Sequence, residues 1–404
     1  MIARTTFSRL RSVRPSPAVL ILSALVAIGV IVALIRFVFG IGAISNLNNS
    51  YPWGLWISLD LLCGVALGAG AFTMAAIVYI FNLKRFRPLL RPSILTGFLG
   101  YVMVIIALLV DLGRPERIWH MIIFQNGNSV LLEIGLCVML YTTVLALEFL
   151  PVLLEKPNWE KPLRILHSIT MPLVILGVVL STLHQSSLGS LFLIMPAKLN
   201  PLWYSPLLPL FFFTSAVAVG LAMVIFESSL SSRAFHRGLE VHLLSTLAKA
   251  IPYVLGFYLL LKFGDLAIEG KLNLLFQPDL FTVLFWIEII AGSVVPIVLF
   301  TRRAIRESSK GLLIGALFVI GGLMLNRFDV SLLAVQHLGD QSYTPNLLEF
   351  AISFGIISAG VLAFGFVAKF FPLFEGGEHG HAAKHTARPV SSTAAPVTAR
   401  SEAA

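Results

Sequence analysis

Ten long runs of apolar residues dominate the chain, and short segments rich in charged residues, proline and glycine separate them. A helix of about 20 apolar residues is long enough to cross the hydrocarbon core of a bilayer. The pattern therefore predicts an all-α integral membrane protein with about ten transmembrane helices. They are expected at residues 18–40, 56–82, 93–112, 129–151, 164–184, 206–230, 241–262, 280–301, 311–332 and 348–371.

The segments outside these spans have distinct compositions. Residues 1–17 carry four arginines before the first apolar run, as a signal peptide would, but no small-residue cleavage site follows, so the run is predicted to be a retained span. Residues 372–404 are rich in Gly, Ala, Ser, Thr and Pro and are predicted to be a disordered tail, whose three histidines are weak metal candidates. The apolar segments 185–205 and 264–279 are expected at the headgroup level, as a partner-docking surface or as plain interface anchors.

The distribution of charge predicts the orientation. The formal net charge of +9 could suit nucleic acid, but the positions of the basic residues argue for a membrane. With the N-terminus inside, 21 Lys and Arg residues fall in inner segments and four fall in outer loops. The positive-inside rule then predicts that both termini are cytoplasmic, and the partner is expected to be lipid rather than nucleic acid. We expect the membrane to be the inner membrane of a bacterium.

Two carboxylates lie within one predicted span, residues 129–151. Glu133 and Glu148 are 15 residues apart, which places them about 22 Å apart along the axis and about 60° apart around it. A carboxylate in the membrane costs about 3 kcal/mol and usually serves proton or ion transfer. The alternative is a pair of structural hydrogen bonds between helices.

Other polar residues of the spans gather toward the predicted outer face, where a pocket of apolar and aromatic side chains with a few acids would suit a quinone. Quinone reduction requires hydrogen-bond donors for the carbonyl oxygens and a supply of protons. The side chains available there as donors and acids are Asp60, Tyr101, Glu133 and His184, and the predicted proton-transfer residues are Glu133, Glu148 and Glu227. Asp111, Glu288, Arg327 and Asp329 are also in or near spans, and pairs such as Arg327 with Asp329 could simply neutralise one another.

Metal and haem sites are not predicted. Cys63 and Cys137 lie within spans without a CxxC or Cys/His spacing, so they are expected to pack in the core rather than hold zinc or an iron–sulfur cluster. A b-type haem in a bundle usually needs two facing axial ligands. Only His167, His184 and His242 are near spans, and His184 is on the opposite side from the other two, so the sequence predicts no haem.

A weak internal repeat predicts how the spans are grouped. The fourth and eighth spans begin with the similar strings SVLLEIG and TVLFWIEI. This would suit two related four-helix bundles, formed by spans 2–5 and 6–9, with the first and last spans flanking them.

Several strings together resemble the NrfD/polysulfide reductase family of membrane subunits, and within it the membrane subunit of nickel–iron hydrogenase-2. They include YPWGLWISLDLLCG (51–64), DLGRPERIW (111–119) and VIFESSL (224–230). The resemblance implies a haem-free subunit that transfers electrons between a ferredoxin-like iron–sulfur subunit and menaquinone or ubiquinone. It also implies periplasmic catalytic partners, the large and small subunits of a nickel–iron hydrogenase, so this chain would not itself act on hydrogen. The family's quinone site corresponds to Trp53, Asp60, Tyr101, Glu133 and His184, and its proton path to Glu148 and Glu227.

Three other functions remain open. The chain could be the membrane subunit of a sulfur, polysulfide or molybdenum reductase, a proton-coupled transporter, or a passive anchor. A transporter usually has helices broken by Gly or Pro at symmetric mid-depth positions, whereas a passive anchor has no need of Glu133 or Glu148.

Overall fold

The computed structural model describes residues 16–48, 51, 53–155, 159–335 and 343–374. Ten helices in this part of the chain are long and apolar enough to cross a membrane, and no β-strand is present among the described residues. This confirms the predicted all-α, multi-pass membrane fold. The predicted N-terminal segment up to residue 15 and the tail from residue 375 lie outside the described residues. The ten helices are Pro17–Phe39, Trp56–Ile80, Lys84–Asp111, Val130–Glu155, Glu160–Leu193, Leu208–Ala234, Val241–Ile268, Leu280–Thr301, Ser309–Leu333 and Leu347–Phe370.

Six spans are formed by a single main helix: α2 (Pro17–Phe39), α5 (Arg87–Asp111), α7 (Val130–Glu155), α8 (Glu160–Leu193), α9 (Leu208–Ala234) and α16 (Leu347–Phe370). The other four are composite. The second span joins η2 (Trp56–Cys63), α3 (Gly64–Leu67), α4 (Gly70–Ala75) and η3 (Ala76–Ile80), and the seventh joins α10 (Val241–Ala248) and α11 (Ile251–Ile268). The eighth joins α12 (Leu280–Ile289), η7 (Ile290–Val294) and α13 (Val295–Thr301), and the ninth joins α15 (Ser309–Phe328) and η8 (Asp329–Leu333).

Four of these segments are π-helical, and three of them carry or adjoin a buried acid. Asp60 lies in η2, Glu288 lies two residues before η7, and Asp329 is the first residue of η8. A π-helical turn bonds residue i to residue i+5 and is found frequently at functional sites. It also shifts the direction of the side chains that follow it relative to a regular α-helix.

Helix α8 is longer than the predicted span 164–184, because it continues to Leu193 through the polar string HQSSLGS. The hydroxyls of Thr182, Ser186 and Ser190 each donate to the carbonyl four residues earlier, at 2.8, 2.9 and 3.3 Å. These internal bonds satisfy polar side chains without ending the helix. The extra turns place residues 185–193 against the helices that form the site.

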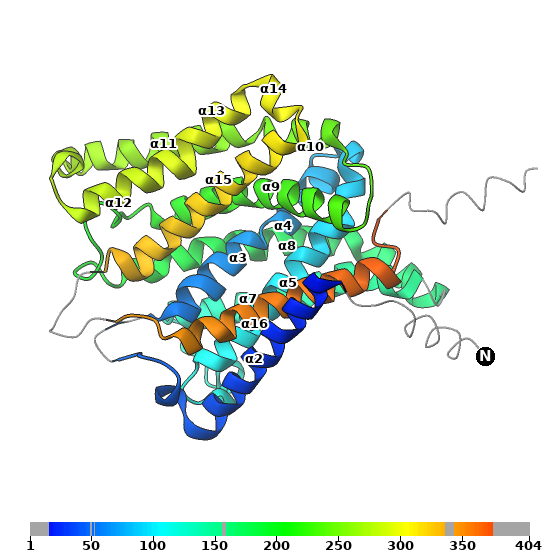
Figure 1. Cartoon of the computed structure of the whole chain (residues 1–404), viewed down its shortest axis with the longest axis horizontal. Helices are drawn as coiled ribbons and strands as arrows, with labels where there is room; N and C mark the ends of the chain where they lie inside the picture. Colours follow the sequence, from blue (N-terminus) through cyan, green and yellow to red (C-terminus); the bar gives the residue numbers. More distant parts are fainter. Residues whose placement is uncertain (1–15, 49–50, 52, 156–158, 336–342, 375–404) are drawn as a thin grey trace, which may run out of the picture.

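The spans group as the sequence predicts. Helices α4, α5, α7 and α8 pack together in a first bundle, α9, α11, α13 and α15 pack in a second, and α2 pairs with α16 at the edge of the first (Figure 1). The two bundles meet where α9 packs on α4 and α8. A Cβ atom at Gly220 of α9 would lie 2.9 Å from the backbone of Ala69, so this close approach requires glycine.

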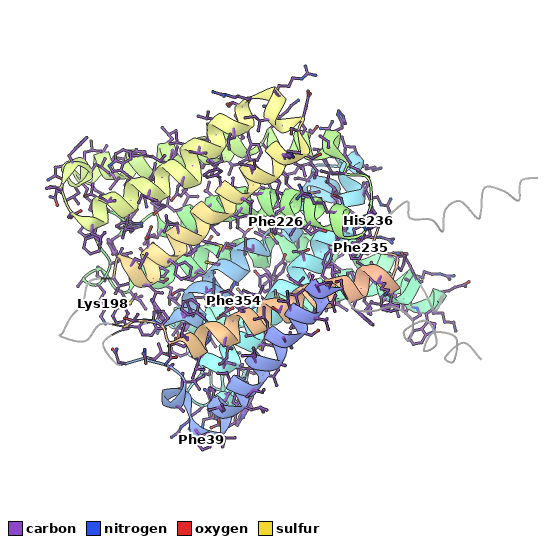
Figure 2. All side chains as sticks on the ribbon, in the orientation of Figure 1. Phe39, Lys198, Phe226, Phe235, His236 and Phe354 are labelled. Atoms are coloured by element: carbon purple, nitrogen blue, oxygen red, sulfur yellow. The ribbon has the colours of Figure 1, made fainter. Side chains whose placement is uncertain are left out.

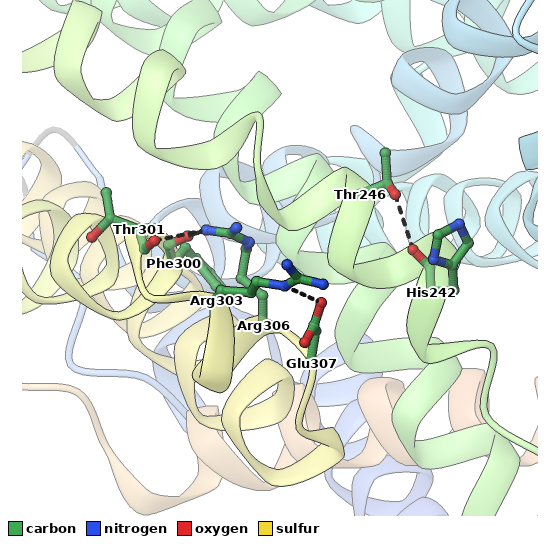
Figure 3. A network of polar contacts seen from close by, with 7 residues as sticks. All are labelled: His242, Thr246, Phe300, Thr301, Arg303, Arg306 and Glu307. Carbon is green, nitrogen blue, oxygen red and sulfur yellow. Dashed lines mark hydrogen bonds and ion pairs between the residues drawn. The ribbon is translucent and has the colours of Figure 1, made fainter.

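The two ends of the helices differ in charge. Figure 2 places Phe39 and Lys198 toward one end of the molecule, with Phe235 and His236 at the other. At the end that carries His236, Arg306 of α14 (Arg303–Arg306) donates to the carbonyls of Phe300 and Thr301, which closes the C-terminus of α13 (Figure 3). Arg303 and Glu307 form an exposed ion pair there, at 2.7 Å. The assignment of this basic end to the cytoplasm stays a prediction.

Candidate functional site

One face of α8 organises the candidate site. Gly177, Ser181, His184 and Phe192 recur at helical spacing, with Ser187 at the edge of the same face. From Gly177 to Phe192 this face spans about 22 Å of the helix axis. Four side chains predicted for the site reach it from neighbouring segments, and His184 belongs to it. The four are Trp53, Tyr101, Glu133 and Glu148.

The centre of the face is a cluster of three buried rings, Tyr101 of α5, Tyr141 of α7 and His184 of α8. The Tyr101 ring centroid lies 4.8 Å from that of Tyr141 and 5.7 Å from that of His184. The Tyr101 ring also lies against Gly68, where a Cβ atom would be 3.3 Å from it. The structure therefore brings Tyr101 and His184 together as predicted, and adds Tyr141.

The polar atoms of this cluster have no hydrogen-bond partner among the residues that the structure describes. They are the hydroxyls of Tyr101 and Tyr141, both ring nitrogens of His184, and the hydroxyl of Ser181. Ser181 lies close to both tyrosine hydroxyls without forming a bond of ordinary geometry. A buried polar group left without a partner costs about 1–3 kcal/mol, so the cluster is suited to receive a polar ligand or water.

Glu133 lies at the rim of the same face, in the first turn of α7. Its side chain is exposed, and its Oε1 accepts a hydrogen bond of 2.5 Å from the Ser187 hydroxyl. That hydroxyl is also 2.9 Å from the carbonyl of Leu183. A hydroxyl has one proton to donate, so it can serve the carboxylate or the carbonyl but not both. When Glu133 is protonated, it can donate to Ser187 while Ser187 donates to Leu183.

The remaining contacts extend the face toward both ends of α8. Trp53 meets Phe192 edge to face at 6.4 Å, and its buried indole Nε1 has no partner in the described part of the chain. At the other end, a Cβ atom at Gly177 would lie 3.7 Å from Oε1 of Glu148, which is also buried without a partner. Glu148 is two helical turns from Tyr141 on the same side of α7. A line of unpaired polar atoms thus follows the contact between α7 and α8.

Two predicted site residues do not reach this face. Asp60 of η2 accepts a hydrogen bond of 2.6 Å from Ser353 of α16, so its carboxylate faces the edge pair of helices. Glu227 of α9 lines a separate small void with Thr96, between the second span, α5 and α9. The void has about 10 Å³ open to the centre of a water molecule, which is the space for about one water. Oε1 of Glu227 and the Thr96 hydroxyl both lack a partner.

A second buried polar cluster occupies the second bundle. Glu288 accepts hydrogen bonds from Trp203 Nε1 at 2.7 Å, from Asn326 Nδ2 at 2.9 Å and from the Tyr258 hydroxyl at 3.5 Å. The structure does not pair Arg327 with Asp329, so the alternative in which these two side chains neutralise each other is wrong. Arg327 instead donates to the Asn326 side chain at 2.6 Å, among other groups, and both Asp329 oxygens lack a donor.

One feature of the sequence indicates this second cluster. Lys262 lies in the apolar string YLLLKFGDL of α11 and is 3% exposed in the structure. Its Nζ lies 5.4 and 5.5 Å from the ring centroids of Phe211 and Phe285. A lysine this deep in a span requires anionic neighbours, but no sequence spacing connects it with Glu288 or Asp329, which are on other spans.

No group of three or more His, Cys, Asp or Glu side chains in the described part of the chain is placed to hold a metal ion. Cys63 and Cys137 are both buried as free thiols.

Comparisons with known proteins agree on one family. A family model described as polysulphide reductase, NrfD, matches residues 43–338. A protein of Nitratidesulfovibrio vulgaris is 39% identical, over 89% of this chain and 94% of its own. The probable Ni/Fe-hydrogenase 2 b-type cytochrome subunit of Escherichia coli is 35% identical, over 89% of this chain and 92% of its own. The menaquinone reductase integral membrane subunit of Nitratidesulfovibrio vulgaris is 28% identical, over 83% and 86%.

The Escherichia coli relative corrects one prediction. Its name describes a b-type cytochrome, which is a haem protein, so the prediction that this chain has no haem is contradicted. In the described part of the chain, His184 is the only buried histidine, and neither of its nitrogens has a hydrogen-bond partner there. No second buried histidine faces it among the described residues, so the side chains described supply one half of a two-histidine haem site.

Proposed function

The chain belongs to the NrfD/polysulphide reductase family and is a membrane subunit of a respiratory oxidoreductase; from this premise we propose that it exchanges electrons with the quinone pool. Its partner would be an iron–sulfur subunit that connects it to a catalytic unit. The names of two relatives, a hydrogenase-2 subunit and a menaquinone reductase subunit, support a nickel–iron hydrogenase as that unit and menaquinone as the quinone.

The observation that carries the proposal is the set of unpaired polar atoms on the α8 face. A quinone head has two carbonyl oxygens that accept hydrogen bonds, and it takes up two protons for every two electrons it receives. Tyr101 offers a buried hydroxyl donor, and His184 offers a nitrogen that can donate or accept, with ring centroids 5.7 Å apart. Groups this close together are placed to converge on one carbonyl oxygen of the head group, which can accept two hydrogen bonds.

The exposed side chain of Glu133 marks where the head group would enter. Its carboxylate lies at the rim of α7 and α8, and His184 is one turn deeper than Ser187 on α8. Tyr101, Tyr141 and His184 pack ring against ring, so the head would displace or rotate at least one ring as it binds. Such rotamer changes are common where ligands bind.

Proton supply would follow the same contact between α7 and α8. Glu133 is placed to pass a proton to the head group at the rim. Glu148 lies on the inner side, two turns from Tyr141, and would deliver protons from the other end of the span. Glu227 has a water-sized void beside it and would act as a relay on the α9 side. Asp60 is bonded to Ser353 and would help to hold α16 rather than bind quinone.

The test uses the intact complex purified from membranes. We expect quinone in the lipid extract, iron–sulfur subunits in the preparation, and a loss of at least tenfold in donor-to-quinone turnover on Glu133→Gln with the complex still assembled. Glu307→Gln, an exposed carboxylate at the basic end, is the matched control and should leave turnover unchanged. Unchanged turnover in Glu133→Gln, or a preparation without redox partners that transports a solute, would contradict the proposal.

A further inference from the structure

Five buried charged side chains form a cluster in the second bundle, and no sequence motif accounts for their meeting. Lys262 and Asp265 come from α11, Glu288 from α12, Arg327 from α15 and Asp329 from η8. Each is no more than 9% exposed, and Asp329 is not exposed at all. Isolated charges in a low-dielectric interior are costly unless they balance, so their total charge constrains how many protons they hold.

The sum of the charges indicates that the cluster binds one proton. With every group ionised, two cations face three carboxylates, and the cluster has a net charge of −1. Electrostatic contacts connect Lys262 with Glu288, Asp265, Asp329 and Arg327, and they also connect Arg327 with Tyr258 and Cys63. Since Tyr258 and Cys63 are neutral in their ordinary forms, neutrality requires that one of the three carboxylates is protonated.

Hydrogen-bond partners identify the group that holds the proton. Glu288 accepts from three donors, Trp203, Tyr258 and Asn326, so both of its carboxyl oxygens already have hydrogen-bond partners. Asp329 receives no donor from the described residues, and the Glu288 carboxyl is its interacting acidic neighbour. Two carboxyls can bond to each other only if one of them carries a proton, so Asp329 and Glu288 are placed to share one.

The cations favour a single shared proton over two. The Nζ atom of Lys262 lies beside two phenyl rings, and its hydration is replaced only in part by cation–π contacts. It therefore depends on a nearby negative charge. Arg327 is fixed elsewhere, since its guanidinium stacks on Phe212 at 3.6 Å and donates to Ser215 at 2.9 Å. The fixed Arg327 and the loosely held Lys262 make Lys262 the cation that would respond to a change in protonation.

A void beside Glu288 provides a route for exchange. It lies between α9, α11, η7 and α15, and its polar lining includes Ser215, Tyr258, Ser293 and Asn326. About 20 Å³ of it is open to the centre of a water molecule, which is the space for one or two waters. It extends from Glu288 past Ser293 in the direction of the basic end of the molecule.

One hydrogen bond connects this cluster to the first bundle. The Ser331 hydroxyl of η8 lies 2.7 Å from the Ser58 hydroxyl of η2. Ser331 is two residues after Asp329, and Ser58 is two residues before Asp60. Both segments are π-helical, so two non-standard turns, each with a buried acid, meet at this bond.

We propose that Asp329 and Glu288 form a second proton-binding site, separate from the α8 face, in which one proton is shared beside Lys262 and exchanges through the adjacent void. Protonation of both carboxyls would leave Lys262 without its counter-charge, and loss of the shared proton would leave the cluster anionic. The site thus holds one proton at rest and can pass it on when Lys262 moves. It does not rest on the quinone proposal, because its residues touch none of the groups on the α8 face.

The experiment is carbodiimide labelling of the purified complex in lipid, with each labelled carboxyl located by mass spectrometry. Dicyclohexylcarbodiimide partitions into bilayers and reacts with protonated carboxyls. We expect one label per chain on the Asp329–Glu288 pair at neutral pH, and no label on the exposed control Glu307. Lys262→Gln retains both carboxyls but removes a cation, so the pair should take a second proton and the label should rise about twofold.

Three results would overturn the proposal. One is the absence of label on both Asp329 and Glu288 while other membrane carboxyls react. Another is an unchanged amount of label in Lys262→Gln. The third is protection of the pair by sodium ions at constant pH, which would make it a sodium site. Infrared spectroscopy provides an independent check, because the protonated-carboxyl band should shift in deuterium oxide and lose the contribution of the pair in Asp329→Asn, whereas Asp279→Asn should leave the band unchanged.

Discussion

Replacing Tyr101 with phenylalanine should distinguish a ligand-binding role of the hydroxyl from a structural role more clearly than any other change at the site. The side chain is fully buried, and its hydroxyl has no hydrogen-bond partner in the structure. Tyr101→Phe keeps the ring that packs on Tyr141 and His184, and deletes only the oxygen. For a structural hydroxyl the deletion would cost about 1 kcal/mol, the net value of a typical hydrogen bond.

For Tyr101 we expect the change in stability to have the opposite sign. Burying an unsatisfied hydroxyl costs about 1–3 kcal/mol, so removing it should leave the stability unchanged or raise it by up to about 1 kcal/mol. Turnover should nevertheless fall. A donor aimed at an oxygen that gains charge during a reaction is worth about 2.7–4 kcal/mol in comparable enzyme sites. Even half of this value corresponds to about a tenfold loss or more.

The assay compares thermal unfolding of the detergent-solubilised complex with its steady-state donor-to-quinone turnover. Tyr253→Phe is the matched control, because Tyr253 lies on α11 with 81% of its surface exposed, and neither quantity should change. For Tyr101→Phe we expect an equal or higher unfolding midpoint together with at least tenfold slower turnover. A lower midpoint with normal turnover would show that the hydroxyl is structural, and would refute the reasoning.

Three further predictions concern stability and pH. Gly322→Ala should destabilise the second bundle by more than 3 kcal/mol, because the added Cβ would lie 1.9 Å from Cα of Gly292 and overpack against the backbone. Gly321→Ala, whose added Cβ would have nothing within 4 Å, should be neutral in the same unfolding assay. Tyr343→Phe should lower the unfolding midpoint by removing about 1–3 kcal/mol, because the hydroxyl, whose pKa is raised by burial, bonds both Leu55 N and the buried Glu349; an unchanged midpoint would contradict this. Asp279 caps the N-terminus of α12, and its bond to a backbone N–H lowers the pKa of its carboxyl. The cap therefore stabilises the start of α12 above the ordinary Asp pKa, and this stabilisation is lost as the pH falls through the lowered pKa, so hydrogen exchange at the start of α12 should rise in acid. Asp279→Asn should abolish that rise.

Much of the membrane fold follows from the sequence because apolar length is a strong signal. The ten spans, the two bundles and the edge pair all appear in the structure. The end of α8 was misplaced, because serine, glutamine and glycine normally indicate a helix end, whereas here the hydroxyls bond back to their own helix. That extension matters, since Ser187 and Phe192 lie on it.

The direction of individual side chains was less predictable. A periodicity of 3.6 residues places Tyr101 and His184 toward the same interior, and they do meet. Asp60 was assigned to the same pocket from its depth, but it lies in the π-helical η2, where the 3.6-residue period does not hold. Its carboxylate meets Ser353 from the last span instead. Depth alone therefore could not predict which bundle face an acid would reach.

The charged cluster of the second bundle was beyond sequence reasoning for a different reason. Lys262, Glu288 and Asp329 come from three spans, and Trp203 comes from a connecting segment. No regular spacing relates these positions. The tempting local pair, Arg327 with Asp329, is two residues apart, and residues two apart do not face each other on a helix.

The most direct test of the quinone site is photolabelling of the membrane-embedded complex with an azido-quinone, followed by identification of the labelled peptides. Binding on the α8 face predicts label on the peptides that contain Tyr101 and His184, and competition by unlabelled menaquinone. Label confined to α11 and α15, or label that excess quinone does not reduce, would contradict it.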